Sequence, residues 1–421
     1  MSCGSERRRP RLLFVAEAVT LAHAGRLMSL ASALADDYEV CFACDPRYDA
    51  QLGESVVERR PVTTIPGERF LAALAKGTPF YDVQTLAGYV EEDRALIAGF
   101  DPVAVIGDFR LSLDVSAKLS GTPYLNITNG YWSPYAKLRY PVPELPFVRL
   151  TGVRTGQWLF DRVWPIFSAR HSLPYNQLRQ RYGLARNSLD TRDVYAGGTY
   201  ALYADIPELV PMRALPRHHR FIGPILWSPA EPQPLWWDEL PRDRPLIYVT
   251  LGSSGDGELL DEVLSAFASL PVFVIAATAG RVAPRDVPAN ARVADFLPGD
   301  AAVAGAALVV SNGGSATGYQ ALAAGVPVVG IASNLDQFIF ANLVEQAGAG
   351  LLLRAGEASA DTIRAAAVQM LHSATMKTRA EAMQRAIARR TPVAGVRTVL
   401  DEIVPRAPVA VGALRATALL V

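Results

Sequence analysis

Short apolar runs recur along the first half of the chain, and an amphipathic stretch follows most of them. The pattern predicts strands over 12–16, 39–43, 103–106 and 124–127, with helices over 25–35 and 112–119. Strands that alternate singly with helices are typical of a parallel sheet covered by helices, which is an α/β fold. In such a sheet, the loops that follow the strands line the ligand crevice.

The same alternation restarts in the second half, after a proline-rich stretch over 226–245. Proline density favours an extended connector and a domain boundary. The predicted elements of the second half are a strand from 246, a helix over 258–268, strands over 272–276, 308–310 and 326–331, helices over 318–324 and 338–347, and two amphipathic helices between 361 and 404 that separate near His372. We therefore expect a domain over 11–225, a linker over 226–245, a second domain over 246–404 and an apolar tail over 405–421.

Composition narrows the class of protein. The 421 residues include 41 basic and 41 acidic side chains, and this balance argues against a dedicated nucleic-acid binder. No apolar run approaches the length of a transmembrane span. Arg7, Arg8, Arg9 and Arg11 precede the first apolar run as in a signal peptide, but that run is short and meets Glu17, which favours a core strand. A cytoplasmic protein is expected, and a homodimer stays open.

Cys41 and Cys44 form a Cys-x-x-Cys pair inside a predicted strand. Positions three apart on a strand face opposite sides, and no second pair is present to complete a zinc site. We interpret both as small buried residues in a reducing compartment, with no metal ion and no cofactor implied.

The most informative stretch begins at 308. A predicted strand ends at Ser311, a glycine-rich turn follows, and a helix is predicted to begin after it. Such a turn leaves several backbone N–H groups pointing outward, and glycine lets an anion approach the backbone closely. Together with the helix dipole, these amides suit a diphosphate group.

Four motifs in order carry a resemblance to a known family. They are Phe296-Leu297-Pro298, the glycine-rich helix start at 312–317, Ala324-Gly-Val-Pro and Asp336-Gln337. The chain resembles the inverting GT-B glycosyltransferases that use nucleotide-activated sugars, those of the family 1 type. The resemblance implies two Rossmann-like domains that face each other across a cleft, the first for a small-molecule acceptor and the second for a UDP- or TDP-sugar co-substrate.

Further implied roles concern the donor. Phe296 would stack on the nucleobase, the Leu297 backbone would contact its edge, and Asp336 with Gln337 would hold sugar hydroxyls. Asn312 stands where the family usually has His, and Gln320 where it usually has Glu; both can hydrogen-bond, but neither brings a charge. The full expected donor set is Gly252, Ser253, Ser254, Phe296, Leu297, Asn312, Gly313, Gly314, Ser315, Ala316, Thr317, Gln320, Asp336 and Gln337.

The resemblance also implies the catalytic pair. His23 follows the first strand, where the family places the general base that deprotonates the acceptor hydroxyl, and imidazole titrates in the right range for that task. Asp108 ends a later strand and would hydrogen-bond to His23. The alternative is that Asp108 only caps the helix predicted to begin near Leu111.

Aromatic residues follow the strand at 124–127. Phe109, Tyr131, Trp132 and Tyr135 are the expected acceptor-binding residues, which hints at an aromatic or lipophilic acceptor, although such side chains can equally cover the sheet. The chain has no Asp-x-Asp pair, so backbone amides rather than a metal ion are expected to stabilise the leaving diphosphate. Two alternatives stay open, a sugar-nucleotide epimerase on the same fold and a catalytically silent partner of another transferase.

Overall fold

The computed structural model describes residues 9–403 apart from 54–55, 253–254 and 282. Ser253, Ser254 and the tail over 405–421 therefore lie outside the described residues, as do Arg7 and Arg8.

A seven-stranded parallel sheet forms the first domain, in the order β3-β2-β1-β4-β5-β6-β7. Its central strand β1 is buried at every position after Arg11, because helices cover both faces of the sheet, and this explains the continuous apolar run. The strands are β1 Arg11–Ala16, β2 Glu39–Cys44, β3 Glu58–Pro61, β4 Ala104–Asp108, β5 Tyr124–Thr128, β6 Tyr200–Tyr203 and β7 His219–Phe221. The helices are α1 Leu21–Leu34, α2 Asp49–Leu52, α3 Gly67–Lys76, α4 Val83–Phe100, α5 Leu113–Ser120, α6 Pro146–Arg181 and α7 Thr191–Tyr195.

A six-stranded parallel sheet forms the second domain, in the order β10-β9-β8-β11-β12-β13. Its strands are β8 Leu246–Thr250, β9 Phe273–Ala277, β10 Ala291–Ala294, β11 Leu308–Ser311, β12 Val328–Ala332 and β13 Gly350–Arg354. Its helices are α8 Leu260–Phe267, α9 Gly299–Ala304, α10 Ser315–Ala323, α11 Leu335–Gln346, α12 Ala360–Leu371 and α13 Ala374–Ala388. The predicted α/β alternation of both halves is confirmed.

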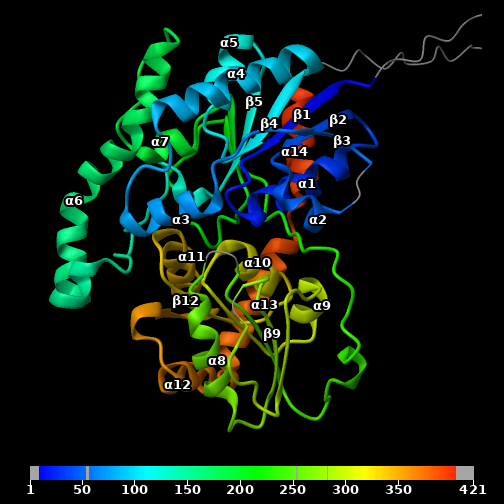
Figure 1. Cartoon of the computed structure of the whole chain (residues 1–421), viewed down its shortest axis with the longest axis vertical. Helices are drawn as coiled ribbons and strands as arrows, with labels where there is room; N and C mark the ends of the chain where they lie inside the picture. Colours follow the sequence, from blue (N-terminus) through cyan, green and yellow to red (C-terminus); the bar gives the residue numbers. More distant parts are fainter. Residues whose placement is uncertain (1–8, 54–55, 253–254, 282, 404–421) are drawn as a thin grey trace, which may run out of the picture.

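The end of the second half differs from the prediction. Three helices follow 360 instead of two, because the chain breaks again before Pro392, which begins α14 Pro392–Ile403. Helix α14 lies beside α1 of the first domain (Figure 1). There Val396, Val399 and Leu400 join the hydrophobic core that α1 and β1 form. The second domain as predicted from sequence, 246–404, therefore includes a helix that packs on the first.

Cys41 and Cys44 lie on β2 and are both buried free thiols, as predicted. Burial raises the pKa of Cys41 to about 11 and that of Cys44 to about 12. Neither thiol is therefore ionised near neutral pH, which fits a packing role.

Side chains from both domains meet along the interface between the sheets. The hydroxyl of Tyr319 on α10 donates to Asp205 Oδ1 (2.7 Å), which follows β6, and Trp132 Nε1 donates to Asp336 Oδ1 (2.8 Å). Tyr131 and Phe340 pack against each other in the same interface. These contacts fix the helix starts of the second domain against the strand ends of the first.

Candidate active site

A cavity of about 1140 Å³ lies between the two domains. The carboxyl ends of β1, β4 and β5 lie on one side of it, and those of β8 and β11 on the other, as expected for parallel sheets. Its volume exceeds the roughly 300–1,000 Å³ of an ordinary ligand pocket, so it has room for two substrates at once.

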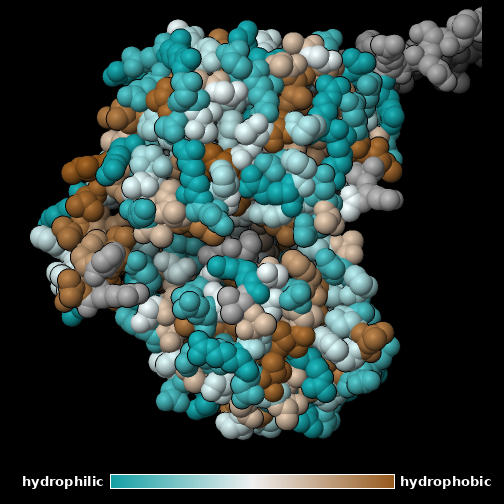
Figure 2. All heavy atoms as spheres, in the orientation of Figure 1, coloured by the Kyte–Doolittle hydropathy of each residue, from teal (hydrophilic) through white to brown (hydrophobic). Residues whose placement is uncertain are grey.

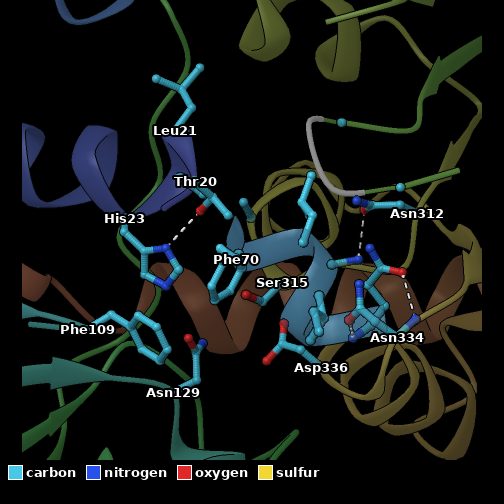
Figure 3. Close-up of a pocket in the computed structure, with 18 of the residues that line it drawn as sticks. Thr20, Leu21, His23, Phe70, Phe109, Asn129, Asn312, Ser315, Asn334 and Asp336 are labelled. Atoms are coloured by element: carbon cyan, nitrogen blue, oxygen red, sulfur yellow. Dashed lines mark hydrogen bonds between the residues drawn. The ribbon is translucent and has the colours of Figure 1, made fainter. Parts of the chain in front are cut away.

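His23 lies in the first turn of α1, not in the loop before it. The sequence placed the helix start near Gly25, but α1 begins at Leu21 with Thr20 as its N-cap residue. Oγ1 of Thr20 lies 2.7 Å from Nδ1 of His23 instead of capping a backbone amide (Figure 3). Burial lowers the pKa of His23 below its ordinary value of 6.5, which keeps the imidazole neutral.

Asp108 does not hydrogen-bond to His23, so the predicted pair is wrong in that form. Both of its carboxylate oxygens are taken by Arg26, through Nη2 to Oδ1 at 2.8 Å and through a closer contact from Nε to Oδ2. Nor does Asp108 cap the next helix, since the N-cap residue of α5 is Ser112. Arg26 also donates to Asn129 Oδ1 (3.0 Å), so Arg26, Asp108 and Asn129 form one hydrogen-bonded group near His23.

Arg26 was not predicted to be a site residue, although the sequence contains a signal for it. It is the single charged residue in the fourteen residues of α1, and it lies on the helix that also carries His23. An arginine in an otherwise apolar helix indicates a buried partner.

Phe109 is held in the left-handed region, with φ of 57°, at the turn that ends β4. Its ring stacks on the ring of His23 at a centroid distance of 5.2 Å. The next residue, Arg110, is fully buried and donates to Glu17 (3.0 Å) and Asp93 (3.1 Å). These buried ion pairs anchor the turn in a conformation that a side chain rarely adopts.

The glycine-rich turn that was predicted to bind an anion, here called the anion loop, lies between β11 and α10. Asn312 Oδ1 accepts from the N–H of Gly314 (3.0 Å), and Gly313 has φ of 76°, which explains the need for glycine there. Helix α10 begins at Ser315 without a side-chain cap, so the amides of its first turn remain available at the cavity wall. Gly314, Ser315, Ala316 and Thr317 line the cavity, whereas Gly313 packs behind the loop against α11.

Three further donor residues reach the cavity with part of their hydrogen-bonding capacity already used. Gln320 Nε2 donates to the carbonyl of Trp227 (2.7 Å) and to Ser228 Oγ (2.8 Å), so it fastens the linker to α10. Gln337 is 2% exposed, and its side chain completes a capping box with Asn334. Asp336 lines the cavity, and its Oδ1 accepts from Trp132.

The remaining expected donor residues, Gly252, Phe296 and Leu297, also line the cavity. The ring of Phe296, on which the resemblance implies that the nucleobase stacks, lies beside the tight turn at Gly280. Among the described residues, no cluster of three or more His, Cys, Asp or Glu side chains is arranged to hold a metal ion.

Of the four expected acceptor residues, Phe109 and Trp132 line the cavity. Tyr131 and Tyr135 do not line it within the described part of the chain. Tyr131 is fully buried in the domain interface, and Tyr135 packs edge-on against His219 at 5.0 Å. Their segment is short and turns sharply, so only part of it faces the cleft. The aromatic wall is instead completed by Phe70, Phe80, Phe160, Phe167 and Tyr195.

The known proteins most informative about this chain are transferases of sugars. Residues 259–402 match the family described as "Erythromycin biosynthesis protein CIII-like, C-terminal domain". A solved glycosyltransferase of kitacinnamycin is similar in structure with a TM-score of 0.70 and 20% identity, covering 94% of this chain and 100% of the other. A spinosyn rhamnosyltransferase solved with thymidine diphosphate gives a TM-score of 0.67 at 18% identity, with 93% of this chain and 100% of the other covered. The fold is therefore GT-B.

Two curated relatives are much closer in sequence. A PGL/p-HBAD biosynthesis glycosyltransferase of Mycobacterium tuberculosis is 49% identical over 380 residues, which is 90% of this chain and 89% of the relative. A PGL/p-HBAD biosynthesis rhamnosyltransferase of Mycobacterium bovis is 50% identical over 369 residues, 87% of this chain and 82% of the relative. The chain belongs to this family of glycosyltransferases, and the resemblance read from its motifs is confirmed. None of the described helices is both long and apolar enough to span a bilayer.

Proposed function

We propose that this glycosyltransferase moves a sugar from a UDP- or TDP-sugar to a hydroxyl group of an aromatic or lipophilic acceptor, with inversion at the anomeric carbon. His23 acts as the general base. The observation that carries the proposal is the position of His23, whose neutral imidazole lies in the cavity between an aromatic wall on the first domain and the anion loop of the second (Figure 3).

The proposed base requires one tautomer of His23. In it, Nδ1–H donates to Oγ1 of Thr20, which lies 2.7 Å away, and the lone pair of Nε2 is free for a proton. An acceptor hydroxyl beside Nε2 gives up its proton as its oxygen attacks the anomeric carbon. The face of attack is opposite the leaving nucleotide, so the configuration of that carbon inverts.

The second domain stabilises the leaving group. Negative charge develops on the diphosphate as the glycosidic bond breaks, and the free amides of the α10 first turn lie at the cavity wall to receive it. Asp336 Oδ2 is left to accept a sugar hydroxyl, since Oδ1 is bonded to Trp132. The Oε1 of Gln320 serves the ribose hydroxyls in the same way, because its Nε2 is already engaged.

The acceptor class follows from the chemistry of the wall. Phe70, Phe80, Phe109, Phe160 and Phe167 offer aromatic surface with no hydrogen-bonding group. A hydrophilic acceptor would lose its water there without replacement, whereas an aromatic or alkyl acceptor gains from burial. The relative named as a rhamnosyltransferase makes rhamnose the first sugar to test.

The donor site is tested by thermal unfolding with UDP, TDP, ADP and GDP. A ligand that binds only the native state raises the melting temperature in proportion to its occupancy. We expect a shift with UDP or TDP and none with the purine nucleotides. Ala316→Asp places a negative charge at the exposed first turn of α10, which favours the helix dipole but repels a diphosphate.

Ala374→Asp is the matched control, because Ala374 is exposed in the first turn of α13 and outside the cavity. Loss of the shift in Ala316→Asp alone supports the anion site. No shift with any nucleotide in the unaltered protein would favour a silent partner instead; a relative at 48% identity over 62% of this chain and 71% of its own length is described as an inactive PGL/p-HBAD biosynthesis glycosyltransferase of Mycobacterium bovis.

A further inference from the structure

The outer face of α6 exposes an unusual number of large apolar side chains. After the break in the helix at Gly152, where φ is 75°, Ile166 is 71% exposed, Trp158 55% and Leu173 48%; Leu150, just before the break, is 89% exposed. In Figure 2 the hydrophobic colour gathers at the left edge of the molecule, over the position that α6 takes in Figure 1. Isolated exposed apolar residues need no explanation, but a gathered group of them on one helix indicates a binding surface.

The inner face of the same helix packs on the rest of the fold and lines part of the cavity. Phe160, Tyr175 and Leu178 are buried there, while Trp164 and Phe167 pack on the first domain and on each other. The helix therefore has an apolar inner face for the core and a second apolar surface that faces outward. Packing within the chain does not require that second surface.

The charges on α6 are almost all positive. Its sequence holds six arginines and one acidic residue, Asp161. Asp161 Oδ2 accepts from Nε of Arg139, which lies outside α6, at 3.0 Å. Arg154, Arg162 and Arg170 are exposed among the apolar residues. The guanidinium of Arg162 lies 3.6 Å from the centroid of the Trp158 ring, so the tryptophan and the cation present one joint surface.

The exposed face continues into the cavity. Val163 is 36% exposed and also lines the cavity, and its neighbours Phe160 and Phe167 belong to the aromatic wall. Helix α6 thus joins the molecular surface to the part of the site that holds the acceptor.

We infer that the outer face of α6 binds an anionic lipid surface. Tryptophan, leucine and isoleucine side chains suit the boundary between headgroups and acyl chains, and arginines that flank them suit lipid phosphates. A second copy of the chain fits less well, because a two-fold contact would bring the arginines of two α6 helices together. The inference does not depend on which sugar or nucleotide the enzyme uses.

The test is sedimentation of the full chain with vesicles of phosphatidylcholine alone and with vesicles containing phosphatidylglycerol. We expect binding to the anionic vesicles, little binding to the neutral ones, and release at high salt as charges are screened. Trp158→Gln with Ile166→Gln should lower the bound fraction at least fivefold, and Arg162→Gln with Arg170→Gln should remove the preference for anionic lipid.

The control is Leu235→Gln with Val287→Gln, since these two side chains are 101% and 43% exposed and lie in the linker and between β9 and β10, outside α6. The control should bind as the unaltered protein does, and melting temperatures of all variants establish that they fold. Equal binding by the Trp158/Ile166 variant, or no binding of the unaltered protein to either vesicle, would overturn the inference. It would also be overturned if light scattering showed a dimer that this variant converts to a monomer without any vesicle binding.

Discussion

Oγ1 of Thr20 lies 2.7 Å from Nδ1 of His23, within one turn of α1. The hydroxyl can accept from Nδ1–H or donate to Nδ1, and the proposed base requires the first arrangement, in which Nε2 is free to take a proton. Thr20→Val keeps the branched shape but removes the hydroxyl, and a lost hydrogen bond costs about 1 kcal/mol. We expect kcat to fall roughly fivefold to tenfold, with donor affinity unchanged.

Thr20→Ser is the matched control, because it keeps the hydroxyl and should retain most of the activity. Steady-state kinetics with the donor varied separates kcat from KM. A Thr20→Val enzyme with the kcat of the unaltered protein would show that the tautomer is set in another way.

The ion pair of Arg26 and Asp108 leads to a different expectation for Asp108. The Arg26 side chain is 14% exposed and that of Asp108 is 1% exposed, so Asp108→Asn leaves the charge of Arg26 without compensation in a largely buried place. Breaking a buried pair costs about 3–5 kcal/mol, and we expect urea unfolding to show a loss of that order. Arg26→Met together with Asp108→Asn removes both charges and should recover most of the stability.

Activity of that double variant decides the role of Asp108. If the double variant folds and still transfers sugar, Asp108 contributes to the stability of the fold and not to the reaction itself. A stable double variant without any transfer would support a direct part for the carboxylate in catalysis.

The burial of His23 predicts the acid side of the pH profile. Its pKa is lowered from 6.5, so the neutral, base-competent form persists as the pH falls below that value. We expect kcat/KM to decline with an apparent pKa below 6.5. Circular dichroism at each pH separates this decline from unfolding. An apparent pKa above 6.5 would contradict the described environment of the imidazole.

The raised pKa of Glu17 predicts that the free energy of unfolding falls as the pH rises. Burial raises its pKa from 4.5 to about 7, against the opposing charge of Arg110 at 3.0 Å. Between these values the folded state holds a proton that the unfolded state lacks, so the stabilisation is full below pH 4.5 and is lost as the pH rises through 7. Glu17→Gln does not titrate. Relative to it, the unaltered protein should lose on the order of 3 kcal/mol of unfolding free energy from pH 4.5 to pH 8.

Chemical denaturation of both proteins across that range gives the difference directly, and other titrating groups such as His23 cancel in it. Parallel curves for the two proteins would show that Glu17 has its ordinary pKa.

Much of the fold could be predicted because its signals are local. The strands ending at Ala16, Asp108 and Ser311 are continuous apolar runs, since each is buried on both faces. The glycine-rich turn before α10 was also predictable, because its glycines and the helix start lie within a few residues of one another.

The parts that could not be predicted depend on contacts between distant residues. Arg26 and Asp108 are 82 positions apart, and no sequence pattern in either segment indicates that the two residues form a pair. The hydrogen bonds from Gln320 Nε2 to the linker likewise join residues 92 and 93 positions apart. The start of α1 was misplaced for a local reason, because the hydroxyl of its N-cap residue Thr20 turns to His23 and not to the helix backbone.

The central claim is that His23 takes the proton of the acceptor hydroxyl, and His23→Gln tests it most directly. Transfer of sugar is measured by product mass spectrometry, with nucleotide binding measured on the same protein. General-base catalysis contributes roughly a hundredfold to ten-thousandfold, so we expect kcat to fall by at least about a hundredfold while the dissociation constant of the nucleotide stays the same. Undiminished transfer by His23→Gln would contradict the account.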